Sequence, residues 1–219
     1  MLDTLEGRVF AAVLFDMDGT LIDSHPAVER SWVRWAQEHD VPLSSFAGMH
    51  GRPAADIVAL FLPPERREAA FRRIEQLETE DTDGVVVLPG TVDALAALPP
   101  GRAAIVTSCT APLARARIGA SGLVQPSVLV TADQVTAGKP APDPYLLAAQ
   151  RLGVSAAQCL VVEDAPAGLA AGRAAGAATL AVTVTHKASE LDADAVVETL
   201  ADVRFVVGDG GVRVVAPSG

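Results

Sequence analysis

Short apolar runs recur along this chain and alternate with segments of helical periodicity. The first run, residues 9–15, contains no polar side chain, as is typical of a parallel strand buried on both faces. Similar runs follow at 103–106, 128–130, 159–162 and 177–182, and helical patterns lie between them at 91–98, 144–152 and 166–175. This alternation predicts an α/β fold whose core is a doubly wound (Rossmann-like) parallel sheet.

One stretch, residues 24–87, interrupts the alternation. Apolar side chains recur there at helical spacing, first at Val28, Trp32 and Trp35, then over 54–61 and 64–80, and no strand pattern is evident. We interpret 24–87 as an inserted all-α cap domain, which leaves 1–23 and 88–219 as the α/β core domain. The charges over 65–73 indicate a solvated helix face.

Composition narrows the class of protein. The 219 residues are 50% hydrophobic and carry a formal charge of −10, which disfavours binding to nucleic acid. No apolar run is long enough for a membrane span. Acids occupy the first residues where a signal peptide is basic, and the two cysteines form no CxxC pair, so we expect a cytoplasmic protein. We also expect a monomer.

Polar residues follow the predicted strands at the edge where ligands bind in such sheets. They comprise two pairs of carboxylates, one pair of hydroxyls and a lysine between a glycine and a proline: Asp16 and Asp18, Glu163 and Asp164, Thr107 and Ser108, and Lys139. Any one of these could be a helix cap or a surface residue, but their order along successive strands favours one site. Four converging carboxylates predict a hard divalent cation, Mg²⁺ by preference. Lysine, hydroxyls and Mg²⁺ together predict phosphate binding.

These segments resemble the four motifs of the haloacid dehalogenase superfamily, and the resemblance spans nearly the whole chain. The matching stretches are 16–21 (DMDGTL), 107–108 (TS), 138–144 (GKPAPDP) and 162–168 (VEDAPAG). The predicted insertion resembles the α-helical C1 cap of that superfamily. Residues 49–53, 88–91 and 163–168 are most similar to the sugar- and polyol-phosphate phosphatases, including glycerol-phosphate and deoxyhexose-phosphate phosphatases.

The resemblance implies a role for each motif residue. Asp16 is the nucleophile that forms an aspartyl-phosphate, and Asp18 is the general acid and then the base. Asp16, the main-chain carbonyl of Asp18 and Asp164 hold Mg²⁺, with Glu163 as a direct or indirect partner. Lys139 neutralises Asp16 and the phosphoryl group. The chain is thus expected to be a Mg²⁺-dependent hydrolase of small phosphomonoesters.

Three further assignments follow from the same resemblance. A hydroxyl at the end of the second strand binds a phosphate oxygen, and it is either Thr107 or Ser108, with Ser108 slightly favoured. His50 and Arg52 lie on a cap loop that contacts substrate in the superfamily, although a helix-capping turn is the alternative. The substrate class is sugar or polyol phosphates, without a preferred member.

Two other functions remain open at this stage. A β-phosphoglucomutase-like phosphotransferase would share the nucleophile, acid, metal site and cap, but such mutases carry a histidine where this chain has Val28. A non-catalytic phosphate-binding module would not need the complete set Asp16, Asp18, Lys139 and Asp164. The missing histidine and the complete set of four residues therefore both favour hydrolysis.

Overall fold

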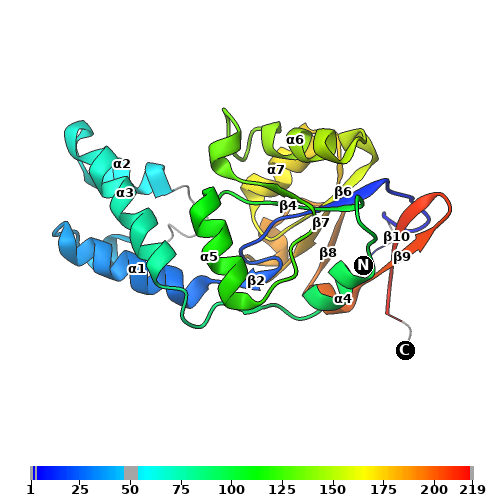
Figure 1. Ribbon diagram of the computed structural model, residues 1–219, viewed down its shortest axis with the longest axis horizontal. Helices are drawn as coiled ribbons and strands as arrows, with labels where there is room; N and C mark the ends of the chain where they lie inside the picture. Colours follow the sequence, from blue (N-terminus) through cyan, green and yellow to red (C-terminus); the bar gives the residue numbers. More distant parts are fainter. Residues whose placement is uncertain (1, 3, 47–53, 218–219) are drawn as a thin grey trace.

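The computed structural model describes residues 2, 4–46 and 54–217, which form a parallel sheet beside a group of helices (Figure 1). The sheet has six strands, all parallel. Their spatial order is β5 (Val128–Val130), β4 (Ala103–Val106), β1 (Ala12–Phe15), β6 (Cys159–Glu163), β7 (Ala178–Val182) and β8 (Ala195–Val197). The predicted doubly wound parallel sheet is therefore confirmed.

The sheet grows away from β1 in two directions. Strands β4 and β5 extend to one side of β1, and β6, β7 and β8 extend to the other. Phe15, the last residue of β1, is paired with Ile105 of β4 and Val162 of β6. The residues after these three strands thus meet at the reversal of strand order, where doubly wound sheets bind their ligands.

Alternate residues of the buried strands face two separate hydrophobic layers, as the pleat of a strand requires. Ala12 and Leu14 pack under α6 (Asp143–Leu152) and α7 (Pro166–Ala174). Val13 and Phe15 face a layer formed by α4 (Thr91–Ala96), α5 (Ala111–Ser121) and the antiparallel hairpin of β9 (Arg204–Gly208) and β10 (Gly211–Val215). Short 3₁₀ helices occur at Leu43–Phe46, Ala132–Gln134, Ala156–Gln158, Ala188–Glu190 and Leu200–Asp202.

The helices between β2 and β3 form a helical unit with a hydrophobic cluster of its own. It consists of α1 (His25–Glu38), α2 (Ala54–Phe61) and α3 (Pro64–Glu80). Trp35 of α1 is fully buried there, packs with Val58 and Ile74, and donates its indole N–H to the Ala70 carbonyl oxygen at 2.8 Å. The helical periodicity of this segment is confirmed, while domain boundaries at 23 and 88 remain a prediction.

The helical unit joins the sheet through two short paired strands. Ile22–Asp23 (β2) and Val86–Val87 (β3) are antiparallel, with Asp23 opposite Val86. The interpretation of 24–87 as free of strands is therefore wrong at its end. A two-residue strand gives no periodicity that could separate it from a loop, and only its pairing with β2 defines it.

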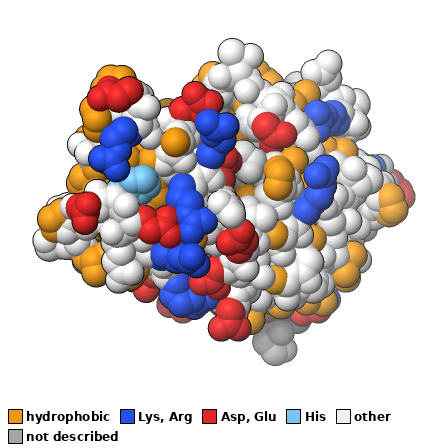
Figure 2. Space-filling model, turned by 60° about the vertical axis from the view of Figure 1, so that its left-hand side comes forward, with side chains coloured by type: hydrophobic (Ala, Val, Ile, Leu, Met, Phe, Trp, Pro, Cys, Tyr) orange, Lys and Arg blue, Asp and Glu red, His pale blue; other side chains and the backbone are white. Residues whose placement is uncertain are grey.

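The outer surface of the helical unit carries charges of both signs. Figure 2 shows Lys and Arg side chains interspersed with Asp and Glu on this side of the molecule. Ion pairs such as Arg73–Glu38 (2.6 Å) and Arg30–Asp81 (2.7 Å) account for part of this pattern. The surface is thus a mixed solvated face and not a basic patch. Within the described residues, no helix combines the length and the apolar character needed to cross a membrane.

Candidate active site

The turn after β1 places Asp16 at the rim of the sheet and then folds back sharply. The Asp16 backbone N–H donates to the Val162 carbonyl oxygen of β6 at 2.9 Å, so the strand pairing continues as far as Asp16. Gly19 follows with a φ of 84°, in the left-handed region that favours glycine. A Cβ at Gly19 would lie 2.2 Å from Asp164 Oδ2. Only glycine therefore lets this turn lie so close to Asp164, the residue that follows β6.

Lys139 lies against Asp16, as the sequence predicts. Its buried ammonium donates to Asp16 Oδ1 (2.5 Å), Glu163 Oε1 (2.7 Å) and the Val106 carbonyl oxygen (2.9 Å), which uses all three of its protons. Burial opposes the charge on Lys139, but the Asp16 and Glu163 carboxylates outweigh it and hold the lysine pKa well above its ordinary value. Lys139 is therefore a fixed positive charge beside Asp16.

Glu163 is fully buried and its oxygens are saturated with hydrogen bonds. Oε1 accepts from Lys139 and from the Tyr145 hydroxyl at 2.9 Å, and Oε2 accepts the backbone N–H groups of Asp164 (3.0 Å) and Ala165 (3.2 Å). Four bonds occupy the acceptor sites of a carboxylate. A Cβ at Gly168 would lie 1.6 Å from Glu163 Oε1, so this glycine makes room for the carboxylate. The hydrogen bonds favour a role for Glu163 in holding Lys139.

Three carboxylates of the predicted metal set converge. One oxygen from each of Asp16, Glu163 and Asp164 lies within 4.8 Å of the others, and all three residues are buried. Burial raises the pKa of Asp16, and burial together with the other two carboxylates raises the pKa of Asp164 well above its ordinary value. Lys139 supplies one positive charge against three negative ones. The group is net negative, and Asp16 and Asp164 offer carboxylate oxygens that fit a hard cation such as Mg²⁺, whereas the oxygens of Glu163 are already occupied.

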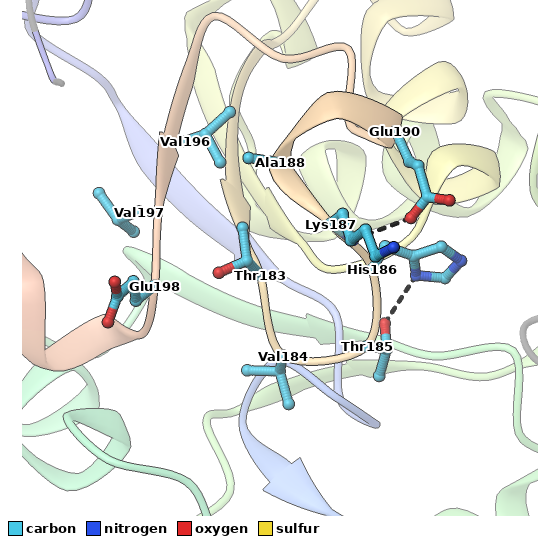
Figure 3. A pocket seen from close by; sticks show the side chains of 10 residues that line it. All are labelled: Thr183, Val184, Thr185, His186, Lys187, Ala188, Glu190, Val196, Val197 and Glu198. Carbon is cyan, nitrogen blue, oxygen red and sulfur yellow. Dashed lines mark hydrogen bonds between the residues drawn. The ribbon is translucent and has the colours of Figure 1, made fainter.

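Thr185, in the loop after β7, holds the carboxylate of Asp164. Its hydroxyl donates to Asp164 Oδ2. The same oxygen contacts the ring nitrogen Nδ1 of His186 at 2.8 Å (Figure 3). Thr185 also lines a surface groove of about 800 Å³ between the segment after β7 and the end of β8. The sequence does not point to Thr185, because a lone threonine in a loop has no pattern of its own.

The Asp18 side chain lies apart from the three clustered carboxylates. Its Oδ1 accepts from the Arg117 guanidinium at 2.9 Å, and its Oδ2 accepts the thiol of Cys109 at 3.1 Å. The Asp18 side chain is therefore not one of the three clustered carboxylates, and its ionic partner is a cation from α5. A metal contact through the Asp18 main-chain carbonyl remains a prediction.

The two hydroxyls after β4 differ in their surroundings. Thr107 is buried, and its Oγ1 accepts the Cys109 backbone N–H at 3.0 Å, whereas Ser108 is exposed on the same turn. Both stand at the predicted edge of the sheet, and the assignment of Ser108 to phosphate remains a prediction. His50 and Arg52 lie outside the described residues.

Comparisons with known proteins identify a hydrolase family and several similar phosphatases. The sequence model of the haloacid dehalogenase-like hydrolase family matches residues 10–176 of this chain. The chain is 45% identical to hexitol phosphatase A of Escherichia coli over 82% of its own length and 87% of that protein. It is 34% identical to glycerol-1-phosphate phosphohydrolase 2 of Saccharomyces cerevisiae, over 80% of this chain and 75% of that one. A hydrolase from Pseudomonas syringae superimposes with a TM-score of 0.76 at 26% identity, over 88% and 95% of the two chains.

Proposed function

Because the chain belongs to the haloacid dehalogenase-like hydrolases, and its named relatives are phosphatases, we propose that it hydrolyses polyol or sugar phosphates through a covalent intermediate on Asp16. The observation that carries the proposal is the buried group of Asp16, Lys139, Glu163 and Asp164 where β1 and β6 end. Phosphoryl transfer needs positive charge to stabilise the phosphoryl oxygens, and here a fixed lysine lies beside one carboxylate, with two further acids close by.

The first half of the reaction uses Asp16 and Asp18. A carboxylate oxygen of Asp16 attacks phosphorus and the ester bond to the leaving oxygen breaks, while protonated Asp18 gives its proton to that oxygen. In the second half, Asp18 takes a proton from a water that attacks the aspartyl-phosphate, which releases inorganic phosphate and restores Asp16. Lys139 stabilises negative charge on the transferred group throughout.

The metal would be held by Asp16, the Asp18 main-chain carbonyl and Asp164. When bound, Mg²⁺ supplies positive charge against the phosphoryl oxygens. Glu163 has no free acceptor site and keeps Lys139 in place, assisted by Tyr145. The hydroxyl of Thr107 or Ser108 donates to a phosphoryl oxygen.

A substrate panel tests the proposed function. We expect phosphate release in Mg²⁺ from sorbitol 6-phosphate, glycerol 1-phosphate, fructose 1-phosphate and 2-deoxyglucose 6-phosphate. The polyol phosphates should be turned over most efficiently, because the chain is 45% identical to the hexitol phosphatase over 188 residues. Glucose 1-phosphate is included because a mutase would convert it to glucose 6-phosphate without net phosphate release. That product, with no hydrolysis of any panel member, would overturn the proposal in favour of the mutase.

Replacing Lys139 by Arg is expected to lower kcat/KM on the best panel substrate at least about tenfold, or roughly 1.4 kcal/mol. The ammonium makes three hydrogen bonds in a buried space, and a larger planar guanidinium cannot reproduce them. Lys139→Ala should lower the rate further, because Asp16 and the phosphoryl group then lose their positive partner. Steady-state phosphate release measures both effects.

The chain offers a matched control for this substitution. Lys187 is exposed and forms no ion pair with Asp16, Glu163 or Asp164, so Lys187→Arg makes the same chemical change outside the buried acidic group and should leave kcat/KM unchanged. A Lys139→Arg variant that matched the wild-type rate would show that Lys139 makes no specific contact in the reaction.

A further inference from the structure

Arg117 is a buried guanidinium between the sheet domain and the helical unit. It projects from α5, and its side chain is 5% exposed. Nη1 donates to Asp18 Oδ1 at 2.9 Å, and Nη2 lies 3.4 Å from the Glu78 carboxylate of α3. A single cation thus bridges Asp18, on the turn after β1, and a helix of the helical unit.

Asp18 has both of its carboxylate oxygens occupied in this arrangement. Arg117 fixes Oδ1, and Cys109 donates its thiol to Oδ2 at 3.1 Å, while Arg117 Nη1 also contacts the same sulfur at 3.2 Å. A short carboxylate held at both oxygens has one orientation. Arg117 and Cys109 together therefore fix the direction in which Asp18 can exchange a proton.

Stability alone does not account for a charge at this position. A buried ion pair is often no more stabilising than apolar side chains of similar volume, because desolvation offsets the attraction. In addition, Arg117 Nε is buried and has no hydrogen-bond partner among the described residues. Burial raises the pKa of Glu78 to about 6, and the Arg117 charge beside it opposes the rise.

We propose that Arg117 is a positioning residue for Asp18 and that Glu78 holds Arg117 from the helical unit. The inference rests on the proposed role of Asp18 as general acid and base. When Asp18 has given its proton to the leaving oxygen, the resulting carboxylate lies against the guanidinium. Through Glu78, the same guanidinium makes the orientation of Asp18 depend on the packing of α3 against α5.

Leaving-group dependence tests this role. Protonation matters little for 4-nitrophenyl phosphate, whose leaving group is stable as an anion, and matters more for phenyl phosphate. We expect Arg117→Met to lower kcat/KM for phenyl phosphate about tenfold more than for 4-nitrophenyl phosphate. Equal losses on the two substrates would indicate a structural role only, and would overturn the proposal. Arg73→Met, which breaks an ion pair within the helical unit, should match wild type on both.

Two gentler variants keep the test decisive if Arg117→Met does not fold. Glu78→Gln retains Arg117 and should shift the phenyl to 4-nitrophenyl ratio in the same sense, by about two- to fivefold. Arg117→Lys should recover part of the ratio, because an ammonium can reach Asp18 but cannot bridge to Glu78. Wild-type ratios in both variants would overturn the inference, whereas a wild-type protein that releases phosphate from no member of the substrate panel in Mg²⁺ would overturn the proposed function itself.

Discussion

Replacing Asp16 by Asn is expected to reduce hydrolysis of the best substrate at least about 10⁴-fold, which is the scale of losing a covalent nucleophile. The amide has nearly the shape of the carboxylate but cannot attack phosphorus, so no aspartyl-phosphate can form. Folding should be retained, because Lys139 keeps its bonds to Glu163 and Val106. Phosphate release and mass spectrometry of acid-quenched protein measure the turnover and the covalent adduct.

A contrasting substitution separates the two aspartates of the loop. Asp18→Asn should still form the adduct slowly from 4-nitrophenyl phosphate, because that leaving group needs little protonation. Asp93→Asn, on the exposed face of α4, is the matched control and should behave as wild type. Turnover in Asp16→Asn comparable to wild type would exclude Asp16 as the nucleophile.

Withdrawal of divalent ions is expected to lower kcat/KM at least about 10³-fold, with full recovery on addition of Mg²⁺. Asp16, Glu163 and Asp164 lie together, and among the described residues Lys139 is the one cation paired with Asp16 and Glu163, so the site repels an incoming phosphate unless a metal ion is present. Phosphate release after EDTA treatment and gel filtration gives the loss. Undiminished turnover by the chelated, metal-free protein would refute a metal requirement.

Thermal unfolding supplies a second measurement that does not depend on turnover. A ligand that binds only the folded state raises the midpoint of unfolding, so Mg²⁺ should stabilise the wild-type protein. Asp164→Asn removes a proposed ligand and should abolish this shift, whereas Asp93→Asn should preserve it. An Mg²⁺ shift of wild-type size in Asp164→Asn would place the ion elsewhere.

The sheet could be predicted from the sequence where apolar runs were long enough to be unambiguous. Residues 9–15 identify β1, because that run contains no polar residue, and 177–182 identify β7, where Thr179 is the single polar residue. Strand β8 has three residues beside a polar loop, and α5 interrupts its apolar face with arginines, so neither was predicted. Both elements are defined by what they pack against.

Some residues of the candidate site could likewise be predicted from the sequence, and others could not. Asp16, Lys139 and Asp164 could be found because each follows its own strand or loop at one edge of the sheet. Arg117 could not, because a single arginine on a helix has the pattern of a solvated charge and its burial between Asp18 and Glu78 is a property of tertiary packing. Tyr145 gave a usable signal. It is the chain's one tyrosine, and in an apolar helix a buried hydroxyl needs a hydrogen-bond partner, here Glu163.

The pairing of β2 with β3 also bears on how the sheet is assembled during folding. Strand β1 ends at Phe15 and its neighbour β4 begins at Ala103, so a long stretch of chain must be closed to join them. Once Asp23 is paired with Val86, the open loop between β1 and β4 is roughly a quarter as long, which lowers the entropic cost of closing it by about 1 kcal/mol. Early formation of this pair therefore speeds the meeting of β1 and β4, even though an insertion separates them in the chain.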